Sequence, residues 1–136
     1  VNGEAPLYLA ISRGEIRSVK ALLEAKADIE EKDDDGNTPL LHAVQYGYNH
    51  IIHFLIDAQA DVHARDNNGV SALNYAVTNG LRRTFDRLIS AGVDIETVDK
   101  DGKSLLMWAT ETYDLSFLER IIKLVKNKIR NDPNSQ

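Results

Sequence analysis

Residues 33–47 read DDDGNTPLLHAVQYG, and this stretch decides the fold. Its first five residues predict a turn, because glycine tolerates a positive φ and the side chains of Asp and Asn bond to their own backbone. Thr38 follows as a helix N-cap and Pro39 as a first-turn proline, where the missing N–H costs nothing. Apolar residues three and four apart then predict a short helix with one apolar face, which Gly47 ends.

A second helix is predicted directly after this glycine. Apolar residues recur four apart between Ile51 and Ile56, the helix ends near Ala58, and an extended arm begins at 61–62. A pair of such short helices is marginal in water by itself. The unit of turn, helix and antiparallel helix therefore needs neighbours.

The same unit returns at a constant spacing along the chain. One alanine in each unit marks the period: Ala10, Ala43, Ala76 and Ala109. Glycines precede these alanines by seven positions at Gly3, Gly36, Gly69 and Gly102, and follow three of them by four positions, with Tyr113 in the fourth unit. Four stacked units bury a continuous core, and about three are the usual minimum. We expect the small alanines where neighbouring units approach closely.

Here the chain resembles the ankyrin repeat family, whose signature is T-P-L-H-x-A on a period of about 33 residues. Residues 38–43 read TPLLHA, and the other copies read APLYLA at 5–10, SALNYA at 71–76 and SLLMWA at 104–109. The resemblance covers the chain from about Gly3 to about Lys123. No copy has histidine at the fourth position of the signature, so we expect packing to replace its hydrogen bonds between repeats.

The resemblance implies an all-α fold, a solenoid of stacked antiparallel helix pairs with short turn or β-hairpin tips. We expect one domain over residues 1–136, with repeats at about 1–32, 33–65, 66–98 and 99–130 and a frayed tail at 131–136. In the last copy, apolar residues alternate with Lys and Arg as far as about Ile129. This pattern predicts a longer helix that caps the stack with a polar outer face.

Composition excludes several classes of function. The net charge is −5, and a mildly acidic chain is a poor candidate for binding nucleic acid. No apolar run approaches the roughly 18 residues that span a bilayer, so we expect no membrane partner. The chain has no cysteine, which excludes disulfides and thiolate sites. Because it begins with Val1, we expect a trimmed N-terminus; the cytoplasm is favoured, with an exported or periplasmic location as the alternative.

The sequence offers little for catalysis or for metal binding. His50 and His53 lie three apart on a predicted helix, but no third zinc ligand occurs at motif spacing. The acidic stretch 33–35 lacks the Glu at the twelfth position of an EF-hand loop. No nucleophile elbow and no glycine-rich phosphate loop is present. We therefore expect no enzyme activity, no cofactor and no metal.

The aromatic residues His42, Tyr75 and Trp108 occupy one position of the repeat, with Leu9 in the first copy. Packing between repeats is the favoured interpretation, and a stripe that faces a ligand is the alternative. Residues 33–65 carry five Asp and one Arg, so the second copy is the acidic one. A partner with a basic contact surface would be steered towards it.

The resemblance also implies where a partner binds, since the variable contacts of ankyrin domains come from the turn and the end of the first helix. Val70 stands out as an apolar residue that we place at an exposed tip, as suits a contact. The residues carried over are Asp34, Asp35, Asn37, Gln45 and Tyr46 in copy two, Asn67, Asn68, Val70, Thr78 and Asn79 in copy three, and Lys100, Asp101, Lys103, Glu111 and Thr112 in copy four.

The function expected from the resemblance is that of a protein–protein interaction module. It would bind a folded partner through the turn tips and the concave face, and it would be a monomer when unbound. Two alternatives stay open: an inhibitor or immunity protein that blocks the active site of a partner enzyme, and the targeting segment of a longer enzyme or channel.

Overall fold

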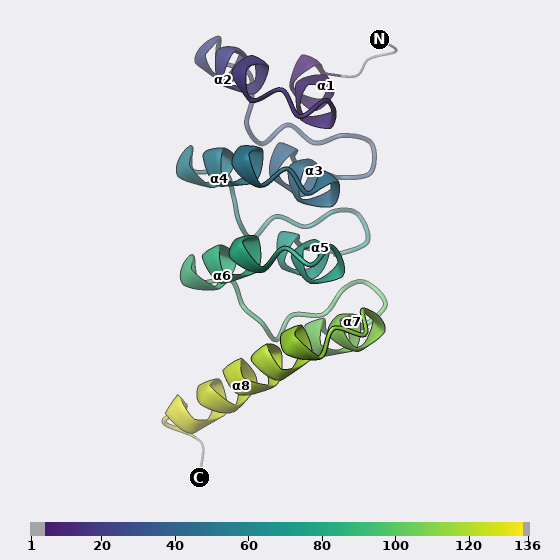
Figure 1. The fold of residues 1–136 in the computed structure, drawn as a ribbon, viewed down its shortest axis with the longest axis vertical. Coiled ribbons are helices and arrows are strands. Elements are labelled where there is room, and N and C mark those ends of the chain that lie inside the picture. The colour runs from purple at the N-terminus through teal and green to yellow at the C-terminus, as the bar shows by residue number, and fades with distance from the viewer. Residues whose placement is uncertain (1–4, 135–136) are drawn as a thin grey trace.

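The computed structural model describes residues 5–134, which form a stack of helix pairs (Figure 1). The helices are α1 Pro6–Ser12, α2 Ile16–Glu24, α3 Pro39–Tyr46, α4 Asn49–Asp57, α5 Ala72–Thr78, α6 Arg82–Ser90, α7 Leu105–Glu111 and α8 Leu115–Asn131. Besides these helices, the described residues contain two isolated antiparallel bridges, one in each of the last two tips, Arg65–Ser71 and Val98–Ser104. The predicted all-α solenoid with hairpin-like tips is confirmed.

The first helices of the pairs, α1, α3, α5 and α7, lie along one side of the stack, and the second helices lie along the other (Figure 1). Successive first helices contact one another more extensively than successive second helices do. We call the side formed by the first helices and the tips the concave face.

Local signals in the sequence define the helix ends. Thr38 caps α3 by accepting a hydrogen bond from the backbone N–H of Leu41 at 3.3 Å. Gly47 ends this helix with φ 77°, a left-handed conformation that suits glycine. Ser71 and Ser104 cap α5 and α7 in the way that Thr38 caps α3. The predicted N-cap, first-turn proline and C-terminal glycine of this copy are confirmed.

The core is continuous along the stack, and the four repeat alanines are all buried in it. Their small side chains allow the first helices to approach closely, as expected. Between the second helices, the rings of Phe85 and Phe117 meet edge to face with their centroids 5.3 Å apart. Each helix pair thus buries its apolar side chains against the next pair.

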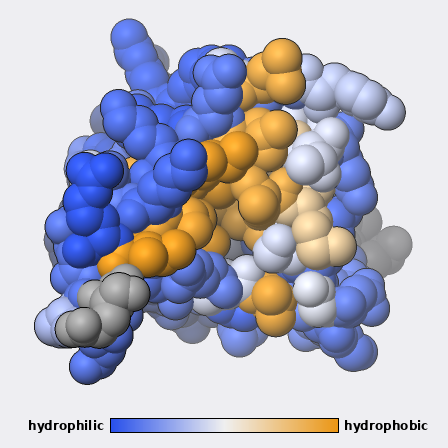
Figure 2. All heavy atoms as spheres, turned by 90° about the horizontal axis from the view of Figure 1, so that it is seen from below, coloured by the Kyte–Doolittle hydropathy of each residue, from blue (hydrophilic) through white to orange (hydrophobic). Residues whose placement is uncertain are grey.

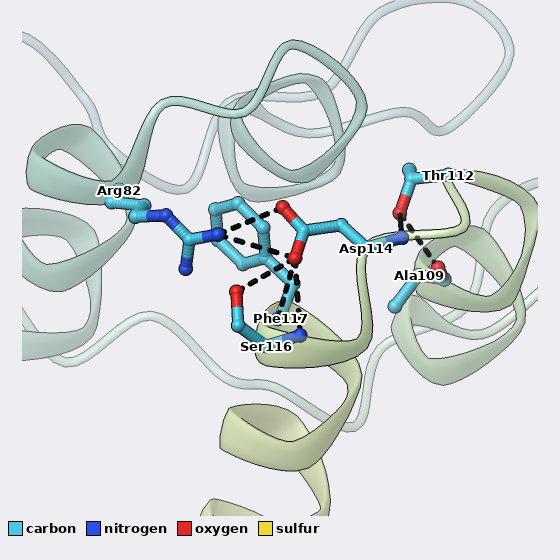
Figure 3. A network of polar contacts seen from close by, with 6 residues as sticks. All are labelled: Arg82, Ala109, Thr112, Asp114, Ser116 and Phe117. Carbon is cyan, nitrogen blue, oxygen red and sulfur yellow. Dashed lines mark hydrogen bonds and ion pairs between the residues drawn. The ribbon is translucent and has the colours of Figure 1, made fainter.

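In the turn before α8, the fourth copy has a tyrosine at the position where the other copies have glycine. Tyr113 has φ 57°, where the preceding copies have glycine, and its side chain is exposed. Asp114 then caps α8 by accepting from the backbone N–H of Ser116 at 3.0 Å (Figure 3). Arg82 of α6 donates to the Asp114 carboxylate at 2.9 Å and lies 4.8 Å from the centre of the Phe117 ring. These contacts attach the last helix to the third copy.

Helix α8 has 17 residues, whereas each of the other second helices has nine. It was expected to end near Ile129 and ends at Asn131. Lys128 pairs with Asp94 at 3.1 Å and with Glu96 at 2.8 Å, which holds the extension against the loop after α6. The tail expected at 131–136 therefore begins inside the helix, and residues 135–136 lie outside the described residues, as does Gly3.

The polar outer face predicted for the C-terminal cap is present only in part: Lys123, Lys126 and Arg130 are exposed on α8, but apolar side chains are exposed beside them. Leu106, Met107, Ile122 and Ile129 are exposed on the last helix pair. The alternation of Lys and Arg with apolar residues in α8 does produce one buried face, but a second row of apolar residues is only partly covered.

Candidate functional site

Each tip in copies two to four is organised by one aspartate. The Oδ1 atom of Asp66 accepts hydrogen bonds from the backbone N–H groups of Asn68 at 2.9 Å and Val70 at 3.0 Å. Asp33 and Asp99 make the equivalent pairs of bonds in their own tips. The carboxylates therefore fix the backbone conformation of the tips.

Aromatic side chains hold two of these aspartates from the first helix. Tyr75 donates from its hydroxyl to Oδ2 of Asp66 at 2.5 Å, and Trp108 donates from Nε1 to Oδ2 of Asp99 at 3.1 Å. The pKa of Asp99 lies below its usual range, first because of the backbone N–H of Lys103 and further because of the Trp108 donor. The position predicted to pack between repeats thus also anchors the tip of its own repeat.

The signal for this anchor was available in the sequence but was not recognised. Asp33, Asp66 and Asp99 keep the same period as the repeat alanines, and the aromatic position follows each of them nine places later. His42 in copy two lies instead edge to face between two tyrosines, 5.1 Å from Tyr8 and 4.9 Å from Tyr46 between ring centroids.

Backbone hydrogen bonds join one tip to the next. The N–H of Asn67 donates to the carbonyl of Asp35 at 2.9 Å, and the N–H of Lys100 donates to the carbonyl of Asn68 at 2.9 Å. The Asn67 side chain adds a bond to the carbonyl of Asp34 at 3.0 Å. The tips of copies two, three and four therefore form one hydrogen-bonded ribbon along the edge of the concave face.

This ribbon requires glycine at the point of closest approach. Gly69 has φ 75°, and a Cβ atom on it would lie 2.8 Å from the backbone nitrogen of Lys100. A Cβ on Gly36 would lie equally close to the backbone nitrogen of Asn67. At Gly102, in the last tip, such an atom would meet nothing within 4 Å, since no further tip follows among the described residues.

Most of the predicted contact residues are accessible on the concave face. Tyr46 is the largest of them, with 50% of its surface exposed. The exposed members of the set are Asp34, Asp35, Tyr46, Asn67, Asn68, Thr78, Asn79, Lys100, Asp101 and Glu111, and the half-buried ones are Gln45, Lys103 and Thr112.

Two predicted contact residues, Asn37 and Val70, are buried, so their placement at exposed tips is wrong. Val70 is only 6% exposed, and its backbone is bonded within the tip: its N–H donates to Oδ1 of Asp66, and its carbonyl accepts from the N–H of Asp66. Asn37 occupies the same position one repeat earlier, and its side-chain oxygen accepts from Nε2 of Gln45 at 2.7 Å. Both residues belong to the base of a tip and not to its surface.

Asn79 is exposed, but its side chain also makes hydrogen bonds within the protein. Its Nδ2 atom donates to the carbonyls of Val44 at 3.0 Å and Gln45 at 3.2 Å. These carbonyls lie at the end of α3, where the helix leaves acceptors without intrahelical partners. The side chain therefore fixes α5 against the end of the preceding first helix.

An aromatic row that was only partly recognised in the sequence continues from Tyr46. Its ring stacks on that of Tyr48 with the centroids 5.7 Å apart and an interplanar angle of 10°. Tyr48 fills the space beside Gly14, where a Cβ would lie 3.1 Å from the tyrosine ring. Together with His42, the two tyrosines form an aromatic surface at the boundary between copies one and two.

Hydrogen bonding at the fourth signature position differs from the expectation. Tyr8 holds this position in copy one, and its hydroxyl, which has a single proton to donate, lies within hydrogen-bonding reach of the backbone carbonyls of Glu31 and Asn37. Its pKa is raised, first by burial and then by nearby carboxylates, so the hydroxyl keeps its proton and acts as a donor. The expected replacement of hydrogen bonds by packing is wrong for this copy.

The acidic patch of the second tip is accessible to charges outside the molecule. The side chains of Asp34 and Asp35 are exposed, and no salt bridge within residues 5–134 engages either of them. Lys103 and Glu111, at the matching end of copy four, pair with each other. The free negative charge on the concave face is therefore concentrated at copy two.

The two histidines considered as zinc ligands have other surroundings. His50 Nε2 lies 3.4 Å from the carbonyl of Gly14, and His53 Nδ1 lies 3.4 Å from a guanidinium nitrogen of Arg87. Within residues 5–134 no three His, Asp or Glu side chains gather into a set that could hold a metal ion. In the same part of the chain, none of the helices has the length and apolar character needed to cross a bilayer.

Comparison with protein families gives one match. A family model described as ankyrin repeats, three copies, matches residues 1–66, which include α1 to α4. The two helix pairs that follow continue the same repeat period, and they keep the same order, with α5 and α7 on the side of α1 and α3 (Figure 1). No curated protein sequence matches the chain.

Proposed function

Since the chain belongs to the ankyrin repeat family, whose members are generally protein–protein interaction modules and are typically not enzymes, we propose that it binds a folded partner protein through the concave face of copies two and three. The contact surface consists of the tips and the ends of the first helices in these copies.

The hydrogen-bonded ribbon of tips is the observation that carries this proposal. The tip of copy three is bonded on one side to Asp35 and on the other to Lys100. A surface held in this way loses little conformational freedom when a partner binds, which lowers the entropic cost of association. The exposed side chains on the ribbon are therefore presented in a fixed geometry.

The chemistry of the surface fits a partner with exposed basic side chains. Asp34 and Asp35 supply negative charge that steers association. The exposed ring of Tyr46, stacked on Tyr48, supplies a rigid apolar platform of the kind that dominates binding energy at interfaces. An arginine or lysine of the partner could lie over this platform and reach the acidic tip.

The proposed contact set is smaller than the set carried over from the resemblance. Asn37 and Val70 leave it because they are buried, and Gln45 is not a central contact because it is half-buried and donates to Asn37. The central contacts are Asp34, Asp35, Tyr46, Asn67, Asn68, Thr78 and Asn79, flanked in copy four by Lys100, Asp101, Lys103, Glu111 and Thr112.

Affinity for the partner recovered with the intact domain tests this function. The variant Asp35→Lys with Tyr46→Ala should weaken binding at least tenfold, because it removes the platform and reverses a steering charge. Glu24→Lys with Ser90→Ala makes the same change in net charge on the second helices and should leave affinity within about twofold. Equal affinities for the two variants would exclude the concave face. A partner enzyme that loses activity on binding would identify the domain as an inhibitor.

A further inference from the structure

The C-terminal end of the stack exposes side chains at positions that are buried elsewhere in the repeat. Leu106 is 38% exposed, whereas Leu73, at the same position one repeat earlier, is 2% exposed. Met107 is 52% exposed, whereas Leu41, two repeats earlier, is 1% exposed. In the earlier copies the next helix pair covers these positions. In copy four none of the described residues covers them.

Helix α8 extends this surface with Ile122 and Ile129, which are exposed, whereas Leu118 and Val125 beside them are half-buried and pack partly against the core. Leu118, Ile122, Val125 and Ile129 are spaced by four, three and four residues, so they form one stripe along the helix. The adjacent stripe, which includes Phe117 and Lys128, contacts copy three. We call the set formed by Leu106, Met107, Leu118, Ile122, Val125 and Ile129 the end face.

The end of the molecule seen from below carries a band of apolar surface bordered by hydrophilic side chains (Figure 2). The end face belongs to two helices, since Leu106 and Met107 lie on α7 and the rest on α8. Helix α8 also runs on past the length of nine residues at which α2, α4 and α6 end. A fifth tip therefore does not begin where the repeat would place it, and the end face has no repeat of this chain stacked on it within residues 5–134.

Basic side chains border the end face on the side away from copy three. Lys123, Lys126 and Arg130 follow the apolar stripe around the helix, since each residue turns by about 100°. All three are exposed, and no salt bridge within the described part of the chain engages them. Glu119, the only acidic residue of α8, lies on the same side of the helix as these three, so it reduces but does not cancel their charge. The border of the end face is therefore positively charged.

We propose that the end face binds an amphipathic helix of another protein. The apolar stripe of this helix packs against the side chains of α7 and α8, as in other cases where a helix occupies an apolar groove. Acidic residues beside that stripe pair with Lys123, Lys126 and Arg130. We expect a helix because helices cover the equivalent positions in the earlier copies. We expect acidic residues on it because the border of the end face is basic.

The same border disfavours a second copy of the chain as the occupant. Two end faces packed together would bring the basic side chains of two α8 helices close to one another, and like charges at an interface cost free energy. The end face shares α7 with the concave face but none of the proposed contact residues, so the two sites can be tested independently.

Two synthetic helical peptides of equal length test the proposal. Both carry leucines spaced as the stripe of α8 is; one has glutamates on its polar face and the other has lysines. Fluorescence anisotropy should show at least tenfold tighter binding of the glutamate peptide to the intact domain. Ile122→Glu should weaken that binding at least tenfold. Val98→Glu, which adds the same charge at an exposed apolar residue of the last tip, should leave it within twofold.

Three results would overturn the proposal. Equal binding of the two peptides would show that the partner need not be acidic. Binding of neither peptide would show that the end face does not bind an amphipathic helix. A dimer of the wild-type domain in sedimentation velocity that Ile122→Glu dissociates would show that a second copy occupies the end face. Circular dichroism should show that Ile122→Glu remains folded, and Tyr46→Ala should bind the glutamate peptide as the wild type does, which separates this site from the concave face.

Discussion

Glycine in the tips and in the turns between paired helices serves two purposes that can be separated by substitution. Gly69 and Gly80 both have positive φ, so alanine at either position costs about 1 to 2 kcal/mol in backbone strain. At Gly69 the new Cβ would also collide with the backbone nitrogen of Lys100, whereas at Gly80 it would meet nothing within 4 Å. We expect Gly69→Ala to cost about 1 kcal/mol more than Gly80→Ala, since it disrupts the hydrogen bond between two tips. Urea unfolding measures the difference, and equal midpoints would argue against a close contact between tips.

A pair of substitutions in α5 and the turn after it distinguishes overpacking from a lost hydrogen bond. Ala76 is fully buried between helix pairs, so Ala76→Leu should cost about 1 to 3 kcal/mol. Asn79→Ala removes the two bonds to carbonyls at the end of α3 and should cost about 0.5 to 1.5 kcal/mol. Asn68→Ala, at an exposed tip, serves as the control and should stay within about 0.5 kcal/mol.

Chemical denaturation of the three variants checks this order. From the sequence alone, Asn79 would be treated as a free surface residue, and its substitution would be expected to have little effect. The bonds to α3 connect residues 34 and 35 positions apart, so no local pattern in the sequence indicates them. If Asn79→Ala unfolds at the same urea concentration as Asn68→Ala, the two hydrogen bonds contribute nothing to stability.

Residues whose role depends on local structure were predicted well. The N-cap Thr38 and the C-cap Gly47 follow from chemistry within one turn of the chain. The exposure of Val70 was predicted wrongly, because burial of that residue depends on how its tip folds back on Asp66 and Ser71. Patterns of single residues therefore indicate helix ends better than they indicate which side chains a partner can reach.

At the scale of the elements, the packing of α4 against α6 gives the protein a dependence on pH. The pKa of His53 is lowered, first by burial and then by the neighbouring Arg87. The unfolded chain, with an ordinary histidine pKa near 6.5, therefore binds a proton at a higher pH than the folded state does. Folding stability should fall as the pH decreases from about 7 towards 5.

Comparison with His53→Gln isolates this contribution. The glutamine variant lacks the titrating group, so its unfolding midpoint should fall less between pH 7.5 and pH 5 than that of the wild type. His50 and His63 are exposed and are present in both proteins, so their contributions cancel in the comparison. A wild-type midpoint that falls no more than that of the variant would contradict the lowered pKa.

The helices themselves were predicted from the repeat period, and the end of α8 was placed within two residues. The apolar end face was missed at this scale. Lys and Arg between the apolar residues of α8 suggested a single buried stripe with a polar outer side. The 17 residues of α8 carry two rows of apolar side chains. Only the packing of copy four on copy three shows which row is buried.

At the scale of the whole molecule, stacking converts four weak units into one rigid surface. Each helix pair buries its apolar side chains against its neighbours, and the tips are bonded in series along one edge. Within residues 5–134, the middle copies are packed against a neighbour on both sides, whereas copy four has one such neighbour. The proposed contacts therefore lie mainly on copies two and three, which have neighbours on both sides. The end face of copy four is a separate surface.

The most direct test of the proposed function is the footprint of the partner on the domain, measured by amide hydrogen exchange in the free and the bound state. The account predicts slower exchange on binding at the second and third tips and at the ends of α3 and α5, with no change in α2, α4 and α6. Protection confined to those second helices, with no change at the tips, would contradict it.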